Sequence, residues 1–240
     1  AHKTLNALTG AAYLHICSDS ISLNRVRTML HAVHTSSPSY MIAASADIAR
    51  ATLSECDYSE IIKECRDFKN AICRQTKIKA LENDDPTRIV LDFSEYSISG
   101  FSVSEKLAER YMIDVEMADL KNVVLIVTPY NRHSDFMSLF HALKEIVTDI
   151  NQPIIPDITA PVIKTRTVSP RKGMYKNTEL VELSRAVGRI AAVSVCMYPP
   201  GSTIICMGEE ITKDAVEYIE AVLKESADVV GITDGKIDVV

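Results

Sequence analysis

The sequence predicts an α/β protein in which helices alternate with short strands. Apolar residues recur at helical spacing from Tyr58 to Ile72, and short apolar runs such as Asn122–Thr128 have the length of strands. Polar and proline-rich stretches separate these segments. With 240 residues, of which 47% are apolar, the chain can bury one large or two small cores.

Composition excludes several function classes. The formal net charge is −6, so no basic surface favours nucleic acid or acidic lipid. The longest strongly apolar run, Val123–Val127, is far shorter than the roughly 20 residues that cross a bilayer. The first residues lack the basic and apolar regions of a secretion signal. We therefore expect a soluble cytoplasmic protein without nucleic-acid or membrane partners.

Cysteine and histidine spacing predicts no metal site. The six cysteines contain no Cys-x-x-Cys pair and have irregular spacings, which favours reduced thiols over zinc ligands or disulfides. His31 and His34 can share one helix face, but no nearby Cys, Asp or Glu completes a ligand set. A structural role is the favoured interpretation of this pair.

The first elements are predicted from local patterns. Ala11–Ile16 has the composition of a short buried strand, and Ser22 begins a helical pattern that continues to Val33. The hydroxyl run Thr35-Ser36-Ser37 before Pro38 can hold a phosphate through side chains and backbone N–H groups. It can equally be an ordinary loop before a helix capped by Ser39, and local evidence favours that simpler interpretation.

A long helix and a domain boundary follow. From Asp57 the apolar positions keep helical spacing to Ile72, and Asp57 with Glu60 forms a candidate capping pair. The polar run Glu82–Pro86 then breaks the pattern, because Pro86 disfavours helix at the residue before it. We place a boundary after residue 82.

The middle of the chain predicts helices packed on one face of a small sheet. A capping box at Ser102 opens a helix to Tyr111, and Ser134 caps a helix whose apolar face continues to Val147. The expected strands are Arg88–Phe93, Val115–Met117 and Asn122–Thr128.

The remaining segment begins with a linker containing three prolines at residues 151–161. A helix is predicted over Glu179–Val187, ended by Gly188, and a final helix has its apolar face from Ala215 to Leu223. Asp234-Gly235 predicts a tight hairpin turn. The expected strands are Ile190–Val195 and Thr203–Met207.

Three separated motifs, in matching order, resemble the fold type I, pyridoxal-phosphate-dependent ornithine/lysine/arginine decarboxylases. The motifs are His2-Lys3-Thr4-Leu5 with the following Leu8-Thr9, Thr35-Ser36-Ser37-Pro38-Ser39-Tyr40 before Ala43–Asp47, and Tyr198-Pro199-Pro200-Gly201 followed by Gly208-Glu209. Val115-Glu116-Met117-Ala118-Asp119 also resembles the family and is expected to serve the fold rather than the reaction.

The resemblance implies specific roles around pyridoxal 5′-phosphate. Lys3 would form the internal Schiff base, and Thr35, Ser36 and Ser37 would contact the phosphate of a partner subunit's cofactor across a homodimer. His2 would contact the phosphate or shape the turn, and the two roles have equal weight.

The implied reaction is decarboxylation of a basic amino acid to its amine in polyamine metabolism. Arginine is the favoured substrate, with lysine and ornithine as alternatives. A buried distal cation on the substrate needs a carboxylate. Glu209 is the candidate for it, with Glu210 or a role at the helix start as alternatives.

The resemblance also implies a domain order. Residues 1–82 would be the C-terminal part of the cofactor-binding major domain, 83–152 a small α/β domain and 153–240 a C-terminal α+β domain. The family's pyridine-nitrogen carboxylate, ring-stacking residue and glycine-rich phosphate loop lie before the lysine and have no counterpart here. We therefore expect a truncated, split or cut polypeptide with little activity alone, or a non-catalytic fragment that assembles with a separate chain supplying the other half.

Overall fold

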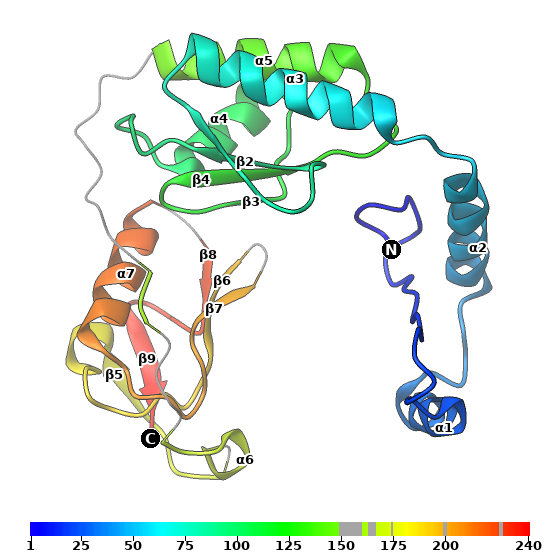
Figure 1. Ribbon diagram of the computed structural model, residues 1–240. Helices are drawn as coiled ribbons and strands as arrows, with labels where there is room; N and C mark the ends of the chain where they lie inside the picture. The colour runs from blue at the N-terminus through cyan, green and yellow to red at the C-terminus, as the bar shows by residue number, and fades with distance from the viewer. Residues whose placement is uncertain (149–159, 163–166, 174, 199–200, 226–227) are drawn as a thin grey trace.

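The computed structural model describes residues 1–148, 160–162, 167–173, 175–198, 201–225 and 228–240. Its described elements form three parts: an N-terminal part with two helices, a middle α/β unit and a C-terminal unit (Figure 1). The expected linker at residues 151–161 lies largely outside the described residues. The predicted α/β class is confirmed by this alternation of helices and strands.

The N-terminal part contains α1 (Leu23–Val33) and α2 (Tyr40–Ser54). Both predicted starts are confirmed, because Ser22 accepts the backbone N–H of Arg25 and Ser39 accepts that of Ile42, each at 3.4 Å. Neither helix is well covered, since α1 has no buried residue and α2 buries only Ala49.

The predicted strand over Ala11–Ile16 is wrong. This segment has no regular secondary structure, and Leu14 is 64% exposed. Its one buried side chain, Ala11, packs against Ala49 of α2 and not against a neighbouring strand. An apolar segment forms a strand only where another strand pairs with it, and here a helix lies beside it.

The middle unit has a four-stranded antiparallel sheet in the order β1-β2-β4-β3. Figure 1 shows its three helices together on one side of the sheet. The elements in chain order are α3 (Ser59–Gln75), β1 (Lys79–Leu81), β2 (Arg88–Asp92), α4 (Gly100–Tyr111), β3 (Met117–Ala118), β4 (Asn122–Ile126) and α5 (His133–Thr148). The expected arrangement of helices on one face is therefore confirmed.

The core of this unit lies between that sheet face and the helices. Ile89 and Leu91 of β2 are fully buried, while the residues that alternate with them are half-buried. The predicted apolar face of α3 is confirmed, because Cys65, Phe68 and Ile72 join the same core. Helix α4 begins earlier than expected: Ser99, not Ser102, is its cap, and accepts the N–H of Ser102 at 3.1 Å.

The expected boundary at residue 82 falls inside this unit. The polar run Glu82–Pro86 joins β1 to β2, and these strands pair with Leu81 opposite Val90. Helix α3, before the run, packs on the same core as β2, after it. The run is thus a connection between paired strands, and the structure keeps residues on both sides of it in one folded unit.

The C-terminal unit packs α7 on two small antiparallel sheets, with strand orders β5-β9 and β7-β6-β8. The predicted apolar face of α7 is confirmed by buried Ala215, Ile219 and Val222. The elements are α6 (Pro170–Gly173), β5 (Glu179–Glu182), a 3₁₀ turn (Leu183–Arg185), β6 (Val195–Tyr198), β7 (Ser202–Ile205), α7 (Lys213–Lys224), β8 (Asp228–Val230) and β9 (Lys236–Val239).

Two predictions in this unit are wrong. Residues 179–182 form strand β5 and not the start of a helix, because β9 pairs with them from Glu179 opposite Val239 to Glu182 opposite Lys236. Residues 190–194 precede the strand β6 that was expected to start there. The predicted turn at Asp234-Gly235 is confirmed by positive φ at both residues, although its flanking strands join different sheets.

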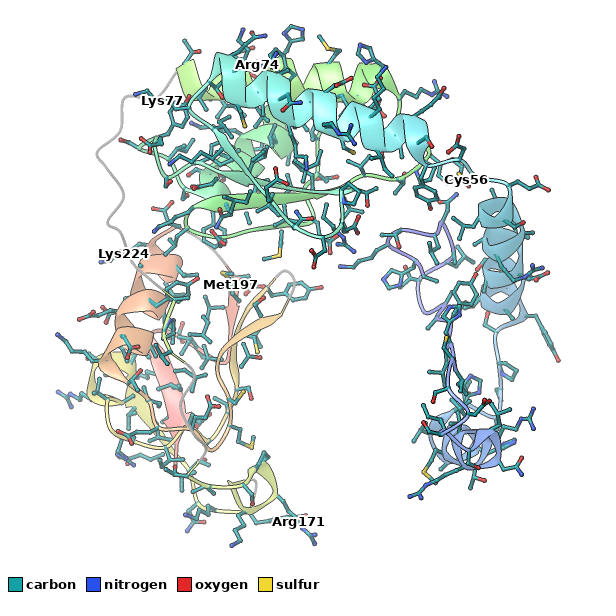
Figure 2. The ribbon with its side chains drawn as sticks, viewed as in Figure 1. Cys56, Arg74, Lys77, Arg171, Met197 and Lys224 are labelled. Carbon is teal, nitrogen blue, oxygen red and sulfur yellow. The ribbon has the colours of Figure 1, made fainter. Side chains whose placement is uncertain are left out.

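Within the described residues, short connections and side-chain contacts join the three parts. Figure 2 shows Cys56 in the short connection between α2 and α3. The same figure shows Met197 inside the C-terminal unit, where its side chain is buried at 4% exposure. Leu120 of the middle unit is buried in the C-terminal core. The Ser99 hydroxyl also donates to the Glu225 carboxylate just after α7, so these two units share an interface.

Candidate functional site

The predicted cofactor lysine lies in a loop that folds back on itself. The backbone N–H of Leu5 donates to the carbonyl of Ala1 at 2.9 Å, and the backbone N–H of Ala11 donates to the carbonyl of Leu8 at 3.0 Å. Asn6 has a φ of 58°, a conformation that Asn tolerates better than most residues. These contacts place Lys3 at the exposed side of a closed loop.

Small side chains hold this loop against α2. Ala7 and Ala11 are buried against Ala49, which lets the loop backbone approach the helix closely. The backbone N–H of Leu8 donates to the Ser45 hydroxyl at 3.1 Å. The position of Lys3 is therefore set by α2, the helix that follows the predicted phosphate-binding hydroxyls.

The Lys3 amine forms an ion pair with the middle unit. Its Nζ donates to Oε1 of Glu116, and the two side chains are 49% and 21% exposed. The backbone N–H of Glu116 donates to the carbonyl of Val124 on β4 at 2.9 Å. The segment Val115–Asp119, expected to serve the fold alone, thus also contacts the predicted cofactor lysine.

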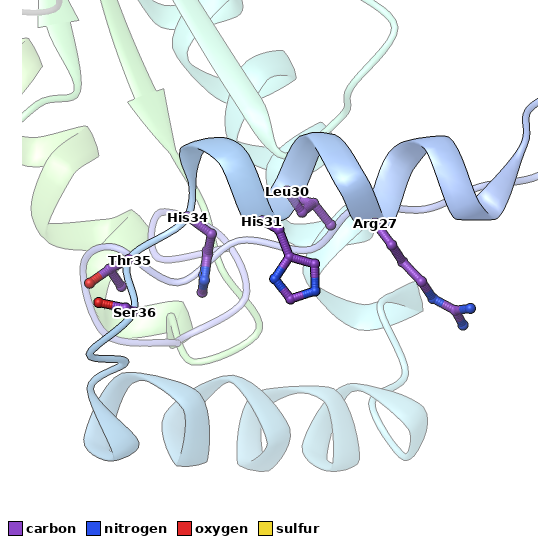
Figure 3. A pocket seen from close by; sticks show the side chains of 6 residues that line it. All are labelled: Arg27, Leu30, His31, His34, Thr35 and Ser36. Carbon is purple, nitrogen blue, oxygen red and sulfur yellow. The ribbon is translucent and has the colours of Figure 1, made fainter.

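A hollow of about 470 Å³ lies between α1 and the loop after it. Figure 3 shows the side chains of Arg27, His31 and His34 on the same side of α1, next to Thr35 and Ser36. Positions 27, 31 and 34 share a face because a helix repeats every 3.6 residues. A guanidinium, two imidazoles and two hydroxyls are donors suited to an anion. All these residues are exposed, so the hollow is open to solvent.

The contacts of the hydroxyl run are compatible with both interpretations of the sequence. Ser39 caps α2, as the simpler one required. Thr35 Oγ1 accepts the backbone N–H of Ser37 at 3.1 Å, while within the described part of the chain no hydrogen bond uses the hydroxyl of Ser36 or Ser37. Those two hydroxyls are therefore available for a ligand, and their phosphate role stays a prediction.

One chain does not assemble the complete predicted set. Lys3 pairs with Glu116 and does not line the hollow that contains Thr35 and Ser36. His2, beside the lysine, is exposed. A site built from two subunits has this property, because the lysine and the hydroxyls would then serve different cofactors. The assignment across a dimer stays a prediction.

Sequence reasoning missed two features of the site. Arg27 was not singled out, although its spacing to His31 and His34 was a usable helical signal. Glu116 had no such signal, because 113 residues separate it from Lys3.

The described residues contain no helix long and apolar enough to span a membrane. They also contain no group of three or more His, Cys, Asp or Glu side chains placed to hold a metal. All six cysteines are free thiols in this structure.

Two family models match the chain in order. Residues 1–92 match "Orn/Lys/Arg decarboxylase, major domain" and residues 156–233 match "Orn/Lys/Arg decarboxylase, C-terminal domain". The chain belongs to the Orn/Lys/Arg decarboxylase family. This membership confirms the resemblance drawn from the three motifs.

Individual relatives agree. The chain is 31% identical over 256 residues to an arginine decarboxylase of Bacillus subtilis, covering 100% of the chain and 52% of that relative. It is 32% identical to an arginine decarboxylase of Halalkalibacterium halodurans, covering 91% of the chain and 48% of the relative. The chain therefore spans about half the length of these decarboxylases.

Solved structures show the same fold. A constitutive lysine decarboxylase of Escherichia coli superposes with a TM-score of 0.68 at 15% identity, covering 92% of this chain and 46% of that one. Lysine decarboxylase A of Pseudomonas aeruginosa superposes with a TM-score of 0.68 at 19% identity, covering 100% of this chain and 48% of that one. At these identities the likeness supports the fold alone.

Within the decarboxylase C-terminal domain, Glu209 has a local contact. It is 7% exposed, and its Oε2 accepts the backbone N–H of Cys206 at 2.8 Å. The neighbouring Glu210 is exposed. The carboxylate therefore closes the turn that begins at Cys206, and a contact with substrate stays a prediction.

Proposed function

We propose that this chain supplies the cofactor-lysine part of a pyridoxal-phosphate-dependent decarboxylase that converts a basic amino acid to its amine. Arginine is the favoured substrate, and polyamine metabolism is the proposed role. The observation that carries the proposal is the alignment of the entire chain with the arginine decarboxylase of Bacillus subtilis.

The side chains present fit pyridoxal phosphate. A phosphate needs several donors. The loop after α1 offers the Ser36 and Ser37 hydroxyls, and α1 offers the Arg27 guanidinium, which lines the same hollow as Ser36. The aldehyde needs a primary amine, and the Lys3 side chain is half exposed on a loop fixed by backbone hydrogen bonds.

When bound, pyridoxal phosphate draws electrons from the bond to the departing carboxylate. In our proposal Lys3 holds the cofactor covalently through its amine, and Thr35, Ser36 and Ser37 anchor the phosphate of the partner subunit's cofactor. His2, next to the lysine, contacts the phosphate or shapes the turn.

Glu209 remains our candidate for the distal cation of the substrate. A buried guanidinium or ammonium needs a carboxylate partner, and Glu209 is a buried carboxylate in the described C-terminal unit. Its second oxygen is the atom available for this role, because Oε2 already accepts from Cys206.

The proposal includes assembly and location. A site with lysine from one subunit and hydroxyls from another requires a homodimer, and the compartment we propose is the cytoplasm. Because the chain spans about half of its relatives, we also propose a polypeptide, covalently joined or separate, that supplies the other half of the site.

Carbon dioxide release from arginine, lysine and ornithine tests the function. The chain is supplied with pyridoxal phosphate, alone and mixed with the N-terminal half of the Bacillus subtilis relative. We expect release from the mixture, fastest with arginine, and none after Lys3→Ala. Equal carbon dioxide release by the Lys3→Ala mixture would contradict the role of Lys3. Faster release from lysine or ornithine would contradict the assignment of arginine as the favoured substrate.

A further inference from the structure

The contact between Lys3 and Glu116 joins two parts of the molecule that are distant in sequence. Lys3 lies in the N-terminal loop on α2, and Glu116 lies immediately before β3 in the middle unit. Residue 116 falls between the two stretches that match the decarboxylase domains. Figure 1 shows the N-terminal loop reaching toward the sheet of the middle unit.

The backbone around Glu116 is fixed on both sides. Before β3, the Glu116 N–H donates to the Val124 carbonyl at 2.9 Å. After β3, the Asp119 carboxylate accepts the backbone N–H groups of Lys121 and Asn122, each at 2.7 Å. Glu116 lies next to β3 on a segment anchored in this way, so its carboxylate has a more defined position than a side chain on an unanchored loop.

The Lys3–Glu116 pair is also better shielded than a comparable surface pair. The Glu116 side chain is 21% exposed, whereas Glu95, which pairs with Lys79 at 2.8 Å, is 51% exposed. Water and salt screen an ion pair less when one partner is partly buried. The amine therefore has to leave a shielded carboxylate before its nitrogen can attack any carbon atom.

From this geometry we propose that Glu116 is a positioning residue for the Lys3 amine. Its carboxylate holds the ammonium at one place beside β3 and restrains it until the nitrogen reacts. The importance of this restraint for catalysis rests on the proposed function, in which Lys3 binds the cofactor. The contact itself does not depend on that function.

Trace labelling with acetic anhydride tests the proposal on the 240-residue chain without cofactor or substrate. The lysine nitrogen forms a bond to one carbonyl carbon, acetate leaves with the electron pair, and the proton passes to solvent. Mass spectrometry then gives the label at each lysine. We expect Glu116→Gln to raise labelling of Lys3 by about two- to fivefold, the range that loss of such an ion pair allows.

Three comparisons separate positioning from a general structural effect. Glu116→Asp keeps the charge on a shorter side chain and should restore part of the protection. Raising salt to about 0.5 M should increase Lys3 labelling in the unchanged chain but not in Glu116→Gln. Glu95→Gln, the matched control, should raise labelling of Lys79 and leave Lys3 unchanged.

Unchanged or reduced Lys3 labelling in Glu116→Gln would overturn the proposal. If Glu116→Gln unfolds the chain, labelling will rise at all lysines. The salt series on the unchanged chain then tests the proposal. If salt raises the labelling of Lys3 no more than that of an unpaired lysine, the proposal is refuted. The labelling assay does not measure turnover. A negative labelling result therefore does not refute the decarboxylase proposal. If the decarboxylase proposal fails, the labelling assay still tests the position of the Lys3 amine.

Discussion

Replacement Glu209→Gln is expected to destabilise the C-terminal unit by about 1 kcal/mol. The Glu209 side chain is 7% exposed, and its carboxylate accepts the Cys206 N–H at 2.8 Å. A hydrogen bond to a charged group contributes about 1.5–3 kcal/mol and a neutral one about 1 kcal/mol. Glutamine keeps the hydrogen-bond acceptor and loses the charge, so the expected loss is the difference between these two contributions. Because Cys206 is only half-buried, we take the low end of that difference.

Glu209→Ala should cost more, about 2 kcal/mol, because it leaves the Cys206 N–H without its side-chain acceptor. Urea unfolding followed by circular dichroism measures both changes. For a unit of this size the slope is about 1 kcal/mol per molar urea, so the midpoints should fall by about 1 M and 2 M.

Glu210→Gln is the matched control, since Glu210 is adjacent but exposed and should change stability by less than about 0.5 kcal/mol. Equal midpoints for Glu209→Gln and Glu210→Gln would refute a turn-closing role for Glu209. A raised KM for arginine without loss of stability would instead favour the proposed contact with substrate.

Three further predictions concern cofactor affinity, core packing and thiol reactivity. Ser37→Ala should weaken pyridoxal phosphate binding by about 1–2 kcal/mol in a fluorescence titration, and unchanged affinity would remove Ser37 from the site. Ile72→Ala, at a fully buried position, should lower the free energy of unfolding in urea by about 2–5 kcal/mol. Met112→Ala, at 88% exposure, should change it by less than about 0.5 kcal/mol. Similar losses for the two variants would contradict the assigned core. Burial raises the pKa of the Cys65 thiol to about 11, so Cys65 should be a thiolate only at high pH. Iodoacetamide at about pH 8 should therefore modify exposed Cys17 first and Cys65 only on unfolding. Equal rates of modification would show that Cys65 is accessible.

Several features that depend on neighbouring residues were predictable from the sequence, although the cap of α4 is Ser99 and not the expected Ser102. The caps at Ser22 and Ser39 and the buried face of α3 follow from hydroxyl side chains and from apolar spacing over one helix. The turn at Asp234-Gly235 follows from residues that tolerate positive φ.

Features that depend on distant partners were not predictable in this way. Residues 179–182 have spacing compatible with a helix, and only pairing with β9 near the end of the chain makes them a strand. Ala11–Ile16 is apolar enough for a strand, but its buried residue Ala11 packs on α2 and not beside another strand. The Lys3–Glu116 contact likewise requires a fold that brings together residues 113 positions apart.

Reductive trapping at Lys3 tests the central claim most directly. The chain, combined with the polypeptide that supplies the other half of the site, is incubated with pyridoxal phosphate and borohydride, and the modified lysines are mapped by mass spectrometry. We predict that Lys3 carries the tag in preference to surface lysines such as Lys79, whose side chain is similarly exposed at 54%. A tag spread evenly over Lys3, Lys79 and other exposed lysines would contradict the assignment of Lys3 as the cofactor lysine.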